Sequence, residues 1–122
     1  MVAFLEMDET VTLREQMADE GGPVVLVNRF TVAPDEADQL LAAWAGDAEW
    51  MKRQEGFVST QLHRGVAGSC VFLNYAVWES TAHFRRAFAH PEFQARIAQY
   101  PPSAVASPHL FRKLAVPGIC SA

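Results

Sequence analysis

Two asparagines interrupt apolar segments of the chain and are the first candidates for chemistry. Asn74 and Trp78 are four residues apart in the run 69–78, so on a strand their side chains point to the same face of the sheet. Asn28 lies in the middle of the apolar run 24–32. A buried amide must be hydrogen bonded, and an amide N–H can stabilise a phenolic or enolic oxygen that gains negative charge. The alternative is that both amides satisfy backbone groups and that Trp78 is a core residue.

Histidines are the candidate bases, because imidazole titrates near neutral pH and can remove an acidic proton. His63 is the first candidate, although it lies at a strand end, where exposed histidines are common. His83, in the second predicted helix, is expected to contact substrate, with a surface or packing role as the alternative. The aromatic side chains expected to line the same site, or else to form core, are Phe30, Trp44, Phe84, Phe88 and Phe93.

The sequence shows no pattern for a metal or an organic cofactor. The two cysteines, Cys70 and Cys120, form neither a disulfide framework nor a zinc set and are expected to be reduced thiols. His83 and His90 are seven residues apart, but Pro91 breaks the helix that would align them. The sequence has no GxGxxG or phosphate-binding loop, so we expect neither metal, flavin nor nucleotide.

The composition is that of a globular chain. Half of the 122 residues are hydrophobic and 20% are charged, as in one domain with a core of its own. No run reaches the ~18 apolar residues of a membrane helix, and the acidic start does not resemble a signal peptide. We therefore expect a soluble, cytoplasmic protein without a membrane partner. The net charge of −4 and the lack of a basic stripe argue against a nucleic-acid partner.

The elements that must position the candidate residues follow from hydrophobic periodicity. A helix is predicted over 35–54, and its single apolar stripe consists of Ala37, Leu40, Leu41, Trp44, Ala48 and Met51. A second helix begins at Ser80, and Pro91 breaks it before a further helical turn. Strands are predicted over 24–32, 57–66, 69–78 and 109–116. The order β-α-β-β-α-β predicts an α+β, ferredoxin-like fold, with an antiparallel four-stranded sheet and helices on one face.

Three segments are expected along the chain. Residues 1–22 form an extension with six acidic side chains and one arginine, in which Thr12 and Glu15 fit a capping box that begins a short helix. Residues 23–117 form the ferredoxin-like domain, and residues 118–122 form a C-terminal tail.

The sheet face that points away from the helices is also predicted to be apolar. If Asn28 points toward the helices, the side chains that point away include Val25, Val27, Val71, Leu73, Tyr75 and Val77, together with Arg29. Such a patch usually marks a subunit interface, so we expect a homodimer formed sheet to sheet.

Five short segments occur in order between residues 24 and 116 and together suggest a family. They are 27–34 (VNRFTVAP), 56–57 (GF), 62–64 (LHR), 74–80 (NYAVWES) and 108–111 (PHLF). Through them the chain resembles the antibiotic biosynthesis monooxygenase family of dimeric α/β-barrel proteins. The resemblance implies a pocket between helices and sheet in each subunit, and a barrel formed by the sheets of two subunits.

The resemblance also implies a chemistry. Aromatic-polyketide members of the family oxidise anthrones to quinones with O2 and with neither metal nor flavin. Asn74 and Trp78 resemble the asparagine and tryptophan associated with that oxidation, and Asn28 also matches a family position. Phe84 departs from the pattern, because anthrone oxidisers are expected to have a tyrosine there.

Other branches of the family fit less well. Ala87 and Arg96 stand where haem-degrading relatives have a tryptophan and an iron-ligating histidine. Ala87 and Glu92 stand where quinol monooxygenases have two histidines. The resemblance thus argues against haem degradation and weakens the case for quinol oxidation.

The function expected from the sequence is a cofactor-independent monooxygenase that oxidises an anthrone-like polycyclic phenol with O2, in secondary metabolism. Asn74 and Asn28 would stabilise the oxyanion, Trp78 would form a pocket wall, and His63 or His83 would move the proton. Two alternatives remain: a polyketide cyclase that uses the same pocket without O2, and a non-catalytic module for small-molecule binding or dimerisation.

Overall fold

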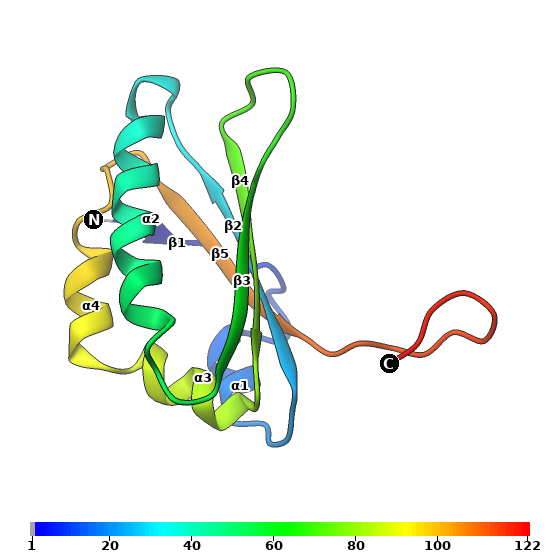
Figure 1. Cartoon of the computed structure of the whole chain (residues 1–122). Coiled ribbons are helices and arrows are strands. Elements are labelled where there is room, and N and C mark those ends of the chain that lie inside the picture. Colours follow the sequence, from blue (N-terminus) through cyan, green and yellow to red (C-terminus); the bar gives the residue numbers. More distant parts are fainter. Residues whose placement is uncertain (1) are drawn as a thin grey trace.

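The computed structural model describes residues 2–122, in which helices cover one face of a sheet and the C-terminal segment projects away from it (Figure 1). The strands are β1 (Ala3–Phe4), β2 (Val24–Thr31), β3 (Phe57–Arg64), β4 (Val71–Trp78) and β5 (Val105–Phe111). The helices are α1 (Leu13–Met17), α2 (Ala37–Met51), α3 (Thr81–Phe88) and α4 (Pro91–Ile97), with a 3-10 turn (Pro34–Glu36) before α2. The order from β2 to β5 confirms the predicted ferredoxin-like arrangement.

The sheet has five strands and is mixed, so the prediction of a four-stranded antiparallel sheet was wrong. The strand order is β1-β5-β2-β4-β3, and β1 pairs with β5 in parallel while the other pairs are antiparallel. The amides of Ala3 and Leu5 donate to the carbonyls of Ala104 and Ala106, at 3.0 and 2.9 Å. A strand of two residues has no alternating pattern to reveal it, but it covers a sheet edge that would otherwise be exposed.

The last strand was also placed wrongly, because β5 begins at Val105 and not at 109. Pro108 lies inside β5, where a proline normally argues against a strand. Backbone groups of every second strand residue point to the same edge, so the nitrogen of Pro108 faces β1 and not β2, as the carbonyls of Ala104 and Ala106 do. No hydrogen bond between β5 and β2 is therefore lost. After Phe111 the chain leaves the sheet as an exposed arm (Figure 1).

Helices α2, α3 and α4 pack on the inner face of the sheet (Figure 1). Ala37 and Leu40 of the predicted stripe are buried on α2, and Trp50, which the stripe did not include, is buried as well. Ser80 caps α3, as predicted, by accepting a hydrogen bond from the amide of His83 at 3.2 Å. Pro91 begins α4, which confirms the predicted break between two short helices.

The outer face of the sheet carries no helix in the part of the chain that the structure describes (Figure 1). Register pairs Val27 with Tyr75 across β2 and β4, and Val25 with Val77, so these side chains share that face. Val71, Tyr75 and Phe111 are 41%, 39% and 42% exposed. We call this surface, with its apolar side chains, the open face. Among residues 2–122, no helix has the length and apolar character needed to cross a membrane.

Candidate functional site

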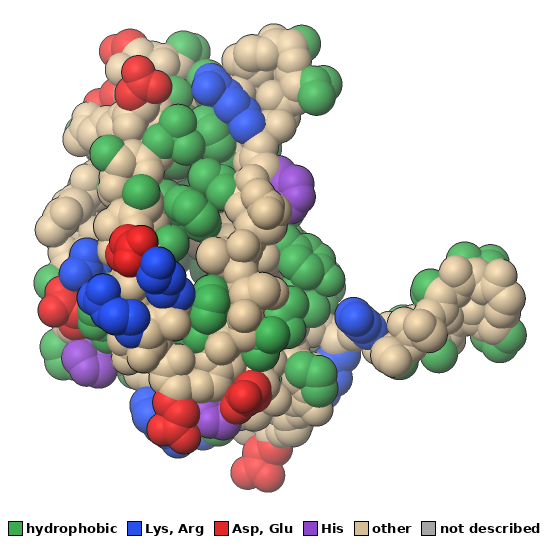
Figure 2. Space-filling view, in the orientation of Figure 1, with side chains coloured by type: hydrophobic (Ala, Val, Ile, Leu, Met, Phe, Trp, Pro, Cys, Tyr) green, Lys and Arg blue, Asp and Glu red, His purple; other side chains and the backbone are tan. Residues whose placement is uncertain are grey.

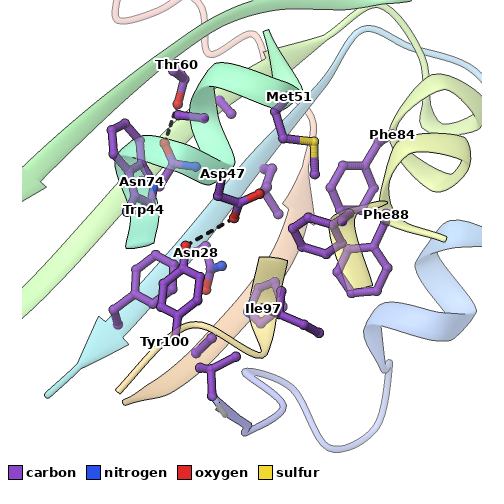
Figure 3. A pocket seen from close by; sticks show the side chains of 18 of the residues that line it. Asn28, Trp44, Asp47, Met51, Thr60, Asn74, Phe84, Phe88, Ile97 and Tyr100 are labelled. Carbon is purple, nitrogen blue, oxygen red and sulfur yellow. Dashed lines mark hydrogen bonds between the residues drawn. The ribbon is translucent and has the colours of Figure 1, made fainter. Parts of the chain in front are cut away.

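A pocket lies between the helices and the inner face of the sheet, and Figure 2 shows its apolar side chains between α2 and β3. Its walls come from the sheet, from α2, α3 and α4, and from the N-terminal segment. Most of the lining is aromatic or aliphatic. The polar residues that line it are Asn28, Asp47, Thr60, Asn74 and Tyr100 (Figure 3). A few polar groups in an apolar pocket are typical of a small-molecule site.

Asn28 and Asn74 lie directly opposite each other in the β2–β4 pair, so their side chains are neighbours on the inner face. Thr60 on β3 donates a hydrogen bond of 2.5 Å from its Oγ1 to Asn74 Oδ1. This contact occupies the carbonyl oxygen of Asn74 and turns its amide nitrogen into the pocket (Figure 3). The site therefore presents an oriented N–H donor to a bound molecule.

The carbonyl oxygen of Asn28 differs from that of Asn74, because no group of the described chain donates to it. Asn28 Oδ1 is buried and accepts no hydrogen bond from residues 2–122. An unsatisfied buried acceptor costs about 1–3 kcal/mol and calls for a partner. A hydroxyl group of a bound molecule would supply such a donor.

The half-buried Asp47 and the buried Tyr100 form an acid–phenol pair at the wall of the pocket (Figure 3). Asp47 projects from α2, and Tyr100, which is 3% exposed, follows α4. Tyr100 Oη donates to Asp47 Oδ2 at 3.1 Å. Burial raises the pKa of Asp47 to about 6, against the smaller, opposing effects of the Tyr100 hydrogen bond and of Arg96. Burial likewise raises the pKa of Tyr100.

The aromatic residues predicted for the site lie in the pocket wall. Trp78 is 1% exposed and makes edge-to-face contacts with Phe57 and Phe84, with ring centroids 5.5 and 5.9 Å apart. Phe30 stacks on the ring of Tyr100 at 5.6 Å. Trp44, Phe84, Phe88 and Phe93 complete this set. These side chains thus belong to the core and to the pocket lining at the same time.

Both candidate histidines lie elsewhere. His63 is paired with Leu73 across β3 and β4 and points to the open face, with its Nδ1 3.3 Å from the carbonyl oxygen of Leu73. His83 Nδ1 lies 2.7 Å from Ser80 Oγ, and its Nε2 lies 3.7 Å from a carboxylate oxygen of Glu55. Neither lines the pocket of its own chain among the described residues. The structure therefore gives no support to His63 as the base or to His83 as a substrate contact in this pocket.

His83 instead packs on a tight turn. A Cβ at Gly56, whose φ is +85°, would lie 2.1 Å from His83 Cγ. Glycine is required at this position for both reasons: its positive φ and the closeness of the imidazole.

Sequence reasoning missed Asp47, Thr60 and Tyr100. Asp47 had a detectable signal, because it lies three residues after Trp44 and four before Met51, within the apolar stripe of the helix. The sequence also left open whether the N-terminal segment, residues 1–22, covers the pocket or reaches a partner subunit. Val2 and Phe4 line the pocket, and the Phe4 ring contacts Phe88 with centroids 6.3 Å apart.

Within residues 2–122, no group of three or more His, Cys, Asp or Glu side chains is arranged to hold a metal ion.

Comparison with known proteins identifies the family of the chain and several relatives. A family model described as antibiotic biosynthesis monooxygenase matches residues 23–99. The chain is similar to deoxynogalonate monooxygenase of Streptomyces nogalater, with 41% identity over 76 residues, which is 62% of this chain and 61% of that protein. The match thus spans about three-fifths of the relative's length. The structure resembles SnoaB, a cofactor-independent oxygenase from Streptomyces nogalater, with 34% identity, a TM-score of 0.67, and coverage of 83% of this chain and 99% of that one.

Proposed function

Because the chain belongs to the antibiotic biosynthesis monooxygenase family, we propose that it is a cofactor-independent oxygenase of an electron-rich polycyclic phenol in polyketide biosynthesis. The observation that carries the proposal is the pair Asn28 and Asn74, set opposite each other in a pocket walled by aromatic rings. The similarity to a cofactor-independent oxygenase supports the same reaction class.

The lining of the pocket, aromatic rings with a few polar groups, favours a flat, anthrone-like substrate. Its rings would pack against the aromatic walls, and its phenolic or carbonyl oxygens would lie near the two amides. Removal of a benzylic proton leaves a carbanion whose negative charge spreads onto the ring carbonyl oxygen. The N–H group of Asn74, already oriented by Thr60, would donate to this oxygen as its charge grows. Asn28 would bind a substrate hydroxyl through its unsatisfied oxygen.

Oxygen then reacts without a cofactor, because the carbanion itself is the reductant. It gives one electron to O2, and the resulting substrate radical and superoxide combine into a peroxide. Loss of the second benzylic proton breaks the O–O bond, so that a CH2 group and O2 become a carbonyl group and water. The apolar walls would keep bulk water from the carbanion.

The test is oxygen uptake with dithranol, a model anthrone, after treatment of the protein with a chelator. We expect uptake by the wild type and a decrease in kcat of about 10²–10³-fold in Asn74→Ala, the loss typical of one oxyanion donor. Gln99→Ala is the control, because Gln99 is exposed and lies outside both the pocket lining and the open face. Unchanged uptake in Asn74→Ala would remove the role of the amide. Ring closure without oxygen uptake would instead indicate a cyclase.

We also propose that the protein acts as a homodimer through its open face. In this arrangement residues 23–117 would form the catalytic domain, and residues 1–22 would add a wall to the pocket, as the positions of Val2 and Phe4 suggest.

A further inference from the structure

Asp47 is the one acidic side chain among the residues that line the pocket of the described chain. Asp47 lies on the side of α2 that faces the sheet. Its side chain projects into the pocket between the two asparagines and Met51 (Figure 3). Only one of its oxygens is engaged, by the hydroxyl of Tyr100. The other, Oδ1, is buried and accepts no hydrogen bond from residues 2–122. The half-buried carboxylate of Asp47 therefore has one oxygen whose capacity to accept a proton or a hydrogen bond is unused within the described chain.

The groups around Asp47 fix its position without neutralising it. Tyr100, from the segment after α4, holds Oδ2. Arg96, from α4, acts on Asp47 only through its charge; it donates to the carbonyl of Gly46 at 2.9 Å and pairs with Glu92 at 3.4 Å. Arg96 is therefore already committed to other acceptors, and Asp47 has no ion-pair partner in the described chain.

We propose that Asp47 is the general base that removes the benzylic proton of the substrate, and that Tyr100 is the residue that positions it; this inference rests on the proposed function. No histidine lines the pocket in the described chain, which leaves Asp47 as its proton acceptor. The two asparagines and Asp47 then divide the work: the amides bind the oxygen that gains charge, and the carboxylate takes the proton.

Each proton can be followed through the reaction. The C–H bond breaks, its electron pair stays on carbon, and the proton goes to the free carboxylate oxygen, which gives a neutral carboxylic acid. After O2 has taken an electron and combined with the substrate radical, the acid returns this proton to the peroxide. The carboxylate then removes the second C–H proton as the O–O bond breaks, and returns it to the departing hydroxide as water. Asp47 ends the cycle ionised, as it began.

The raised pKa of Asp47 fits this role. A carboxyl group that titrates near pH 6 is ionised at neutral pH but is a stronger base than an ordinary aspartate. The rate of proton removal should therefore rise with pH through about 6 and then level off. The hydrogen bond from Tyr100 stabilises the ionised form, so its removal should move this rise to higher pH.

Proton removal can be measured apart from oxidation. Under nitrogen and in D2O, exchange of the methylene hydrogens of dithranol for deuterium, followed by NMR, reports the base alone. We expect the wild type to accelerate this exchange and Asp47→Asn to lose about 10²–10⁴-fold, the usual contribution of a general base. Asp38→Asn is the matched control, since Asp38 is an exposed aspartate on the same helix. Exchange in Asp47→Asn at the wild-type rate, or no exchange in the wild type, would overturn the proposal.

Tyr100→Phe provides the second test, which holds even if Asp47→Asn fails to fold. We expect it to keep the exchange activity but to shift the rise of the exchange rate to higher pH. A Tyr100 with a purely structural role would lower the rate at every pH without moving the profile, and that result would overturn its positioning role. Oxygen uptake measured in parallel separates the two proposals. Exchange without oxygen uptake would contradict the proposed oxygenase but support Asp47 as the base. Oxygen uptake that does not depend on Asp47 would support the oxygenase but contradict Asp47 as its base.

Discussion

At the residue scale, the orientation of Asn74 depends on a neighbour on another strand. Thr60 Oγ1 donates to Asn74 Oδ1, so the amide plane is held with its nitrogen toward the pocket. Without that hydrogen bond the amide can rotate, and its donor is no longer preorganised for the charged oxygen. Thr60 therefore contributes to the oxyanion site without being a donor to the substrate itself.

Thr60→Val tests this dependence. Valine keeps the shape of threonine but cannot donate, so we expect oxygen uptake with dithranol to fall by about tenfold, or about 1.4 kcal/mol, mainly in kcat. Thr10→Val is the control, because it makes the same substitution at an exposed threonine outside the pocket lining and the open face. A Thr60→Val protein with wild-type kcat would show that Asn74 is held by its surroundings alone.

Asp47 also links the site to the stability of the fold. Its pKa is raised from 3.8 to about 6, so the folded protein binds the proton more tightly than the unfolded chain. The free energy of unfolding should therefore fall as pH rises from about 4 to about 6 and stay lower above that, by up to about 3 kcal/mol. Asp47→Asn removes this penalty, because an amide is neutral at every pH and can still accept from Tyr100.

Urea unfolding at pH 4.5 and pH 7.5 measures this effect. We expect Asp47→Asn to be more stable than the wild type at the higher pH and close to it at the lower. Asp38→Asn should differ little from the wild type at both. If Asp47→Asn is destabilised equally at both pH values, burial of the ionised Asp47 carboxylate does not destabilise the fold. A gain in stability together with a loss of catalysis would be typical of an active-site charge.

Part of the site could be predicted from residue types alone. Asn28 and Asn74 were singled out because they interrupt apolar strands, Trp78 because it shares a strand face with Asn74, and the helical aromatic residues because of their spacing. Asp47 was missed because an acidic residue on a helix is usually solvated. His63 was placed in the site because of its chemistry, although Leu62, its apolar neighbour, indicated that His63 points the other way. Tyr100 reaches the site only through the path of a loop, which no local pattern encodes.

At the scale of elements, the N-terminal segment completes the sheet by two different means. Main-chain pairing of β1 covers the start of β5. Further along, the side-chain amide of Gln16 on α1 takes the place of a neighbouring strand: its Nε2 donates to the carbonyl of Leu110 and its Oε1 accepts from the amide of Leu110, both at 2.9 Å. The outer edge of β5 is thus satisfied on either side of Pro108, which has no amide to satisfy.

Gln16→Ala should expose this edge. It removes both hydrogen bonds to Leu110, and we expect the free energy of unfolding to fall by about 1–3 kcal/mol. Arg14→Ala, an exposed position on the same helix, is the control. Gln16→Glu is informative as well, because it keeps the acceptor but loses the donor and should also destabilise. Equal stability of Gln16→Ala and the control in urea would mean that water replaces the amide without loss.

The elements that could be predicted are those with long, regular patterns. Strands β2, β3 and β4 and helix α2 lie close to their predicted bounds, because alternation and the 3.6-residue period extend over many residues. Strands β1 and β5 could not be placed in the same way. The first is only two residues long, and the second contains a proline that is tolerated only because of how the sheet edge is built.

At the scale of the whole molecule, the two faces of the sheet differ in what covers them. The inner face is buried by helices and contains the pocket. The open face presents Val71, Tyr75 and Phe111 to solvent, and the arm that follows Phe111 leaves the body of the chain (Figure 1). A sheet face without a helix that leaves several large apolar side chains exposed is typical of a subunit interface.

Tyr75→Arg is expected to separate the proposed homodimer. In a two-fold symmetric interface each substitution occurs twice. Two arginine side chains would then be buried between the sheets, where their charges lose hydration and gain no opposite charge. Light scattering coupled to size exclusion, at low micromolar concentration, should give twice the 13.5 kDa chain mass for the wild type and the single mass for Tyr75→Arg. Val66→Arg, at a turn position that is 90% exposed and outside the open face, should stay dimeric. A monomeric wild type, or a Tyr75→Arg protein that remains dimeric, would mean that the open face is not where two copies meet.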